Sequence, residues 1–136
     1  MAISLSGLAN FDSWTASFGL YASNAWNSAD LEPDGIDNWS EYLFGGNPTN
    51  HDATAILPTV GIEGSWMEYV YRRRNDYQAQ GLTYTVEATT NLVSNLWNTN
   101  GVVEIDFGSV NPEIDSVTNR VSTEERPEQF IRLRVW

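Results

Sequence analysis

Cysteine and lysine are both absent from the chain, and His51 is its only histidine. Without cysteine the protein can form neither a disulfide nor a thiolate metal site, and one imidazole is too few for the usual zinc centres. No serine lies in a nucleophile-elbow sequence that His51 could serve. These absences favour a protein that is not an enzyme.

Long apolar runs are also missing. No stretch approaches the roughly 18 residues of a membrane-spanning helix. Residues 1–8 lack the basic region that opens a signal peptide. We therefore expect no membrane insertion. Either the protein is cytosolic, or the sequence is a mature or excised form with an added Met, and these residues do not choose between the two.

Positive charge is scarce, because 7 basic residues, all arginine, face 18 acidic residues and leave a net charge of −11. Such a surface repels phosphate and anionic lipid, which argues against nucleic acid as a partner, and it attracts cations. Alternatively, the charge serves only solubility.

The first 52 residues show helical spacing. Phe11, Trp14 and Phe18 fall on one helix face, and Asp12 or Ser13 is a suitable capping residue for its start. Shorter helices are expected at 21–26 and at 39–44. Gly45-Gly46 and Asn47-Pro48 end the last of these.

After residue 55 the pattern becomes strand-like. Alternating β-formers predict strands at 65–72, 83–89, 102–107, 114–121 and 129–136, with turn signals that include 61–64 and 75–81. This spacing predicts a mainly β fold, an antiparallel β-sandwich over 53–136. We expect it to pack with the helical segment 1–52 as one compact unit.

The segment 30–41 matches an EF-hand calcium loop. That loop needs oxygen ligands at positions 1, 3, 5 and 12, Gly at 6, a main-chain carbonyl at 7 and a direct or water-mediated ligand at 9. The predicted calcium ligands are Asp30, Glu32, Asp34, Ile36 through its carbonyl, Asn38 and Glu41. Gly35 supplies the turn.

The loop departs from the pattern in three ways. Glu32 is longer than the usual Asp, Asp37 stands where an apolar residue is common, and no second loop follows. A solitary loop excludes the paired opening of calcium sensors. The alternative is an acidic surface turn in which Asp37 caps the next helix.

The motif order resembles the C-terminal module of many exported proteins of Verrucomicrobia and Planctomycetes. The matching segments are Asp-x-Glu-x-Asp-Gly-Ile-x-Asn-x-x-Glu-Tyr from Asp30, then 43–48, 71–74, 81–89 and 130–135. The loop itself is similar to those of dockerins and thrombospondin type 3 repeats. The family usually has Asp where this chain has Glu32.

The resemblance implies an extracellular or cell-surface, calcium-stabilised β domain without enzymatic activity. We expect a structural or adhesion module whose partners are other protein subunits. It could be a filament subunit, with the apolar segment 3–8 adding a strand to a neighbour's sheet.

The alternative function is carbohydrate binding through exposed tryptophans and tyrosines, with polysaccharide as the partner. Six tryptophans are available, although they can equally fill the core. The run Arg72-Arg73-Arg74 could contact an anion, but pairing with carboxylates such as Asp76 is the simpler expectation.

Overall fold

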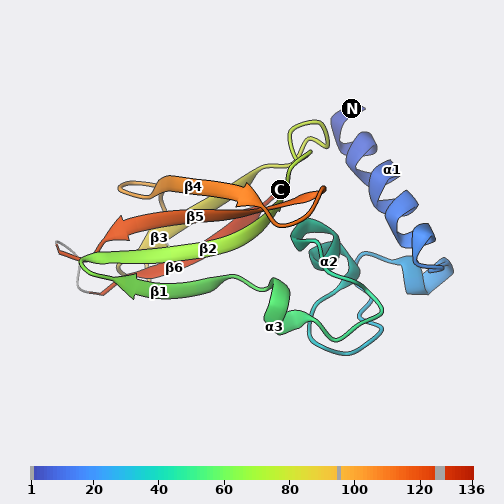
Figure 1. Ribbon diagram of the computed structural model, residues 1–136, viewed down its shortest axis with the longest axis horizontal. Coiled ribbons are helices and arrows are strands. Elements are labelled where there is room, and N and C mark those ends of the chain that lie inside the picture. Colours follow the sequence, from blue (N-terminus) through green and yellow to red (C-terminus); the bar gives the residue numbers. More distant parts are fainter. Residues whose placement is uncertain (1, 95, 125–127) are drawn as a thin grey trace.

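The computed structural model describes residues 2–94, 96–124 and 128–136, with side chains from residue 10 onward. Within these ranges the helices are α1 (Ala2–Ser17), the 3-10 helix η1 (Ala22–Ala25), α2 (Asn38–Phe44) and α3 (Ala53–Ile56). The strands gather at one end of the molecule, and α1 and α2 lie at the other (Figure 1). Among the described residues, no helix has the length and apolarity to cross a membrane.

Two antiparallel sheets carry the fold. The larger has the order β1 (Thr59–Glu63), β2 (Trp66–Arg74), β5 (Ile114–Ser122) and β4 (Val103–Ser109). The smaller pairs β3 (Tyr84–Thr89) with β6 (Phe130–Val135). The chain is therefore mainly β, as the sequence predicted.

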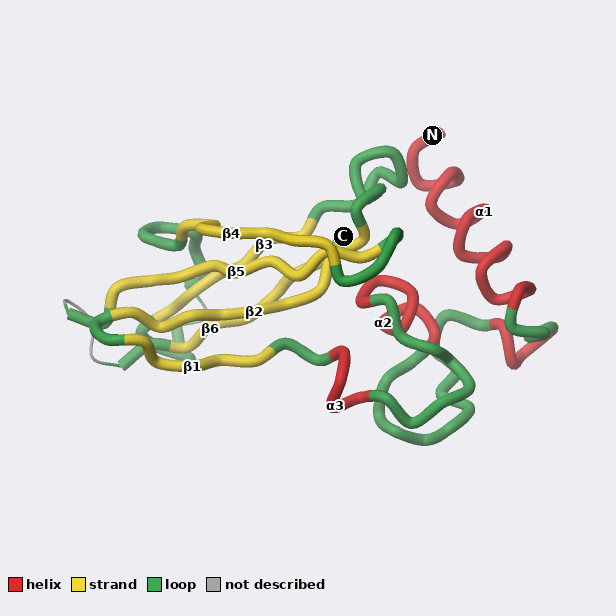
Figure 2. The backbone as a smooth tube through the Cα atoms, viewed as in Figure 1, coloured by secondary structure: helices red, strands yellow, loops and turns green. Residues whose placement is uncertain are grey.

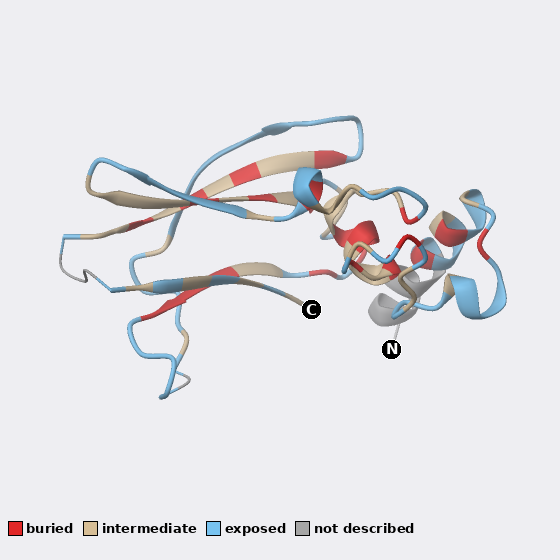
Figure 3. Cartoon of the chain, turned by 90° about the horizontal axis from the view of Figure 1, so that it is seen from below, coloured by how far each residue is buried: buried red, intermediate tan, exposed pale blue. Residues whose placement is uncertain are grey.

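The two sheets pack face to face. Tyr69 and Tyr71 of β2, Val117 of β5 and Val86 of β3 form a buried cluster between them. Along β2 and β5 these positions alternate with more exposed ones, which is the period of two that the sequence indicated. Buried residues concentrate between the layers and around α2 (Figure 3).

A second cluster attaches the helical segment to the sheets. Phe11, Tyr42 and Leu43 pack with Leu82, and Tyr84 borders both clusters. The Tyr84 hydroxyl donates a hydrogen bond to the Leu43 carbonyl at 2.7 Å. Side-chain packing and hydrogen bonds thus join the two parts of the chain.

Strand β1 was not predicted. We expected a turn at 61–64, but the turn between β1 and β2 begins later, with Gly64 at φ +60°, and Gly61 lies within a strand. All five residues of β1 are exposed, so no apolar face marks it in the sequence. Pairing with β2 creates this strand.

The predicted start of the first helix was wrong. The structure begins α1 at Ala2, so Asp12 and Ser13 lie within it, although its end before Gly19 agrees with the prediction. Segment 3–8 is therefore helical and offers no strand to a neighbour. The short helix α3 was not anticipated.

Loops dominate the connections around α2, as Figure 2 shows. These loops carry the acidic residues of the candidate site.

Candidate metal centre

Asp30 and Asp34 organise the backbone of the acidic loop. The Gly35 amide donates to Asp30 Oδ2 at 2.9 Å, and the Asp34 amide lies 3.3 Å from Asp30 Oδ1. The Ile36 amide donates to Asp34 Oδ1 at 3.0 Å. Gly35 has a φ of +90°, a backbone conformation that residues other than glycine rarely adopt. The loop therefore curls around its own carboxylates.

Two carboxylate triads share Asp34. One contains Asp30, Glu32 and Asp34, and the other contains Asp34, Glu41 and Asp52. In each triad, one oxygen from every residue lies within 4.8 Å of the others. The five carboxylates thus form one cluster, which we call the carboxylate cluster.

Five oxygens of this cluster are buried and have no hydrogen-bond partner in the described part of the chain. They are both carboxylate oxygens of Glu32, both of Glu41, and Asp52 Oδ1. Glu41 has no exposed surface, and Glu32 is 8% exposed. Because a buried carboxylate without partners is strongly destabilising, the cluster requires a proton or a cation.

The raised pKa values of Glu41 and Glu32 agree with this need for a proton or a cation. Burial raises the pKa of Glu41 to about 9, with further increases from the charge of Asp52 and from contact with Glu32. Burial also raises the pKa of Glu32, although contact with Glu41 opposes that rise. Without a cation, burial therefore favours the protonated form of Glu41.

Local structure holds Glu41 in place. Asp37 caps α2 by accepting a hydrogen bond from the Ser40 amide at 2.9 Å, which puts Glu41 in the first helical turn. The role of Asp37 as a cap agrees with the alternative interpretation of the loop. Capping and ligation involve different residues, so the two interpretations are compatible.

The other two predicted ligands, Ile36 and Asn38, contribute no carboxylate to the cluster. The Asn38 side chain is 1% exposed, and its Nδ2 donates to the carbonyls of Asn24 and Trp26 at 2.8 and 2.9 Å. The Ile36 side chain is buried. Asn38 therefore fastens the segment before the loop, a contact that its position in the motif did not indicate.

Asp52 was not predicted. It lies 11 residues beyond Glu41 in the chain, outside the span of any loop template. The structure brings it back because Asp52 Oδ2 accepts a hydrogen bond from the Asn47 amide at 2.8 Å, which closes the turn after α2. An acidic residue after the Asn47-Pro48 turn was the only available signal.

The donor set suits a hard cation. Carboxylate oxygens are the ligands that calcium and magnesium prefer, and the cluster contains neither nitrogen nor sulfur. The residues therefore fit a metal ion of this class.

The arginines of the 72–74 run that have described partners pair with acids. Arg74 Nε lies 3.0 Å from Asp76, and Arg73 lies 3.0 Å from Glu104. Arg132 likewise pairs with Glu87 across β3 and β6 at 3.1 Å. These pairings agree with the structural role expected from the sequence.

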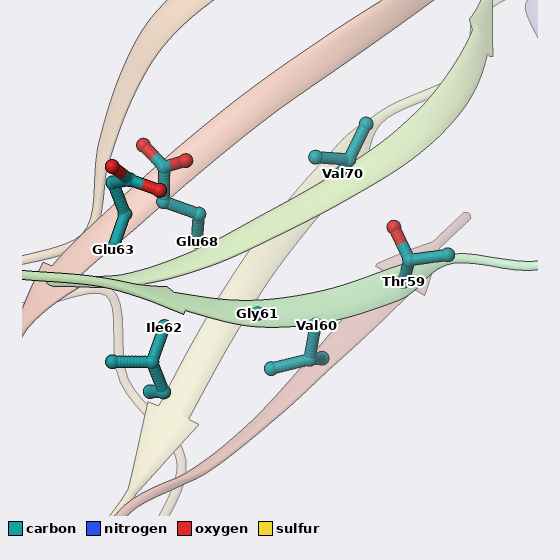
Figure 4. A pocket seen from close by; sticks show the side chains of 7 residues that line it. All are labelled: Thr59, Val60, Gly61, Ile62, Glu63, Glu68 and Val70. Atoms are coloured by element: carbon teal, nitrogen blue, oxygen red, sulfur yellow. The ribbon is translucent and has the colours of Figure 1, made fainter.

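A hollow of about 200 Å³ lies along β1 and β2. Figure 4 shows Val60 and Ile62 pointing to one side of β1, and Glu63 and Glu68 to the other. The lining contains no histidine, serine or cysteine to act as base or nucleophile. His51, the candidate base, is exposed and absent from the lining.

The tryptophans divide by exposure. Trp26 is 64% exposed and Trp136 is 55% exposed, whereas the other four are half-buried. Trp14 and Trp39 pack against Phe11 and Tyr42 within the helical segment. Most of the tryptophans therefore take part in packing.

Three comparisons, with protein-family models, curated proteins and solved structures, gave no match for this chain. The carboxylate cluster is therefore the basis for a functional assignment.

Proposed function

We propose that the protein is a calcium-stabilised, non-enzymatic structural module of an extracellular or cell-surface protein. The burial of Glu41 and Glu32 without hydrogen-bond partners carries the proposal. A bound calcium ion would be the positively charged partner that these buried carboxylates lack in the described part of the chain.

Calcium fits better than magnesium. Calcium accepts six to eight oxygens in flexible geometry, whereas magnesium demands an octahedron and keeps several waters. Five carboxylates from one loop and the following turn can provide most of a calcium shell. The loop 30–41 then acts as a solitary EF-hand-like loop whose first and last ligands are Asp30 and Glu41.

An extracellular or cell-surface location is part of the proposal. Extracellular calcium modules have dissociation constants of about 10⁻⁴–10⁻³ M, which suits a structural site that stays filled in a calcium-rich surrounding. The two packed sheets form, in this proposal, a small β-sandwich that presents the loop at one end.

Calorimetric titration and thermal unfolding test the proposal. Calcium should bind at one equivalent and raise the Tm, and EGTA should reverse the rise. At a concentration 1,000 times the Kd, the ion should add about 4 kcal/mol to the free energy of unfolding. Equal Tm values in calcium and in EGTA would contradict the proposal. Magnesium serves as the control ion.

Self-assembly into a surface fibre is a separate part of the proposal. The edge strands β1 and β4 expose Val60, Ile62 and Phe107, whereas a net charge of −11 opposes association. Light scattering with calcium and with EGTA should detect oligomers in calcium. A monomer in both conditions would contradict self-assembly and leave the calcium site unaffected.

Carbohydrate binding is the second candidate. Tyr21 and Trp26 flank η1 and are 69% and 64% exposed, which leaves two aromatic rings available for stacking on sugars. A glycan array would test this, with Trp26→Ala as the variant and Trp136→Ala as the control. An array without hits would reject the candidate.

A further inference from the structure

Asp52 joins the carboxylate cluster from outside the loop. It precedes α3, and its amide lies 3.2 Å from Asp34 Oδ2. Its Oδ2 is occupied by the Asn47 amide, whereas its Oδ1 is buried without a partner in the described part of the chain. Asp52 Oδ1 therefore needs a proton or a cation as its partner, as the oxygens of Glu32 and Glu41 do.

The Asn38 side chain forms hydrogen bonds outside the carboxylate cluster. Both carbonyls that its amide group binds belong to the segment before the loop, and the side chain is almost completely buried. Both bonds are donated by Nδ2, so they do not involve Oδ1 and are compatible with ligation by Asn38. Asp52 can likewise ligate through Oδ1 while its Oδ2 holds the turn.

We propose that Asp52 is a direct ligand of the cation, a ligand that the loop pattern does not contain. This inference rests on the proposed calcium site. The ion then connects the loop 30–41 to the turn that leads through α3 into β1.

The two triads fit one coordination shell. Ligands on opposite sides of a calcium ion are separated by up to about 5 Å, because each bond measures roughly 2.3–2.6 Å. The triads share Asp34, so Glu41 and Asp52 can join Asp30 and Glu32 in the same shell.

The turn that Asp52 closes is packed against the site. Ile56 of α3 is 2% exposed, and its Cδ1 would lie 2.6 Å from a Cβ at Gly46. Strand β1 begins three residues after Ile56. An ion held by Asp52 thus restrains the connection to the edge of the larger sheet.

Terbium luminescence provides the first test, because lifetimes in H₂O and D₂O count the waters on a bound lanthanide. In Asp52→Asn we expect about one more coordinated water and calcium binding weakened on the order of tenfold. Asp37→Asn is the matched control, since it removes the same charge nearby and asparagine still caps α2. The control should retain the wild-type water count.

Asp52→Ser provides a second variant, because its hydroxyl can accept the hydrogen bond of the Asn47 amide but supplies no carboxylate to the ion. It should show the same additional water and the same weaker calcium binding as Asp52→Asn. A wild-type water count and affinity in Asp52→Ser would overturn the inference even if Asp52→Asn fails to fold.

Hydrogen exchange tests the connection. Calcium should slow amide exchange at Ile56 and Leu57 in the wild type and in Asp37→Asn, but not in Asp52→Asn. If the wild type binds no calcium, the proposed function fails with the inference. If the wild type binds calcium and Asp52→Asn matches Asp37→Asn in affinity and water count, only the inference fails.

Discussion

Glu41 lies directly against Gly46, and a Cβ at position 46 would collide with Glu41 Oε2 and crowd Ile56 Cδ1. Glycine is needed here for space, because no positive φ is involved. The helix α2 and the turn that follows it can therefore meet around the carboxylate.

Gly46→Ala should destabilise the protein by about 1–3 kcal/mol and weaken calcium binding, because the methyl group displaces Glu41. Urea unfolding and calorimetric titration measure the two effects. Gly61→Ala is the control, since a Cβ there meets no atom within 4 Å. Wild-type calcium affinity in Gly46→Ala would contradict the close packing.

The metal-free protein should lose stability as the pH rises from 4.5 to about 9. Burial raises the pKa of Glu41 to about 9 in the folded state, while the unfolded group titrates near 4.5. The contribution of this proton to the free energy of unfolding is therefore complete below pH 4.5. It declines as the pH rises and is lost once the pH passes the folded pKa of about 9. The slope should reach about 1.4 kcal/mol per pH unit for one proton.

Urea unfolding of calcium-free protein across this range measures that slope. In saturating calcium the decline should disappear, because the ion replaces the proton. A metal-free stability that increases between pH 5 and 8 would contradict the raised pKa.

Glu41→Gln should abolish most of the calcium-induced stabilisation while leaving metal-free stability at pH 7 within about 1 kcal/mol. The neutral amide replaces the protonated carboxyl that the raised pKa of Glu41 favours in the metal-free protein. Thermal unfolding with calcium and with EGTA separates these effects. Glu63→Gln removes one exposed charge from β1 and should keep the full calcium response.

Arg74→Met should destabilise the protein by about 2 kcal/mol, as judged by urea unfolding. The Arg74 guanidinium donates to the Tyr42 carbonyl, pairs with Asp76 and stacks 4.2 Å from the Tyr42 ring centroid. Arg120→Met is the matched control, because Arg120 covers the half-buried Trp66 ring and should contribute less than about 1 kcal/mol. Equal losses in both variants would refute a specific role for Arg74.

Local patterns predicted most of the fold. Tyr69 and Tyr71 alternate with less buried residues, so β2 was recognisable from its side chains. Strand β1 lacked this signal because every residue in it faces solvent. The extension of α1 to Ala2 was likewise missed, because the aromatic spacing begins only at Phe11.

The site was predictable only within one continuous segment. The spacing from Asp30 to Glu41 identified four of the five clustered carboxylates. The place of Asp52 depends on how the chain returns after Pro48, and the contacts of Asn38 depend on where Asn24 lies. Such tertiary relationships leave no fixed spacing in a sequence.

Tyr84 borders both hydrophobic clusters and hydrogen-bonds to the Leu43 carbonyl. We therefore expect that the compositional change near residue 52 does not separate two independently folding units. Residues 53–136 expressed alone would uncover Leu82 and the Tyr84 ring to water. We expect such a fragment to aggregate or unfold, and the whole chain to melt in a single cooperative transition.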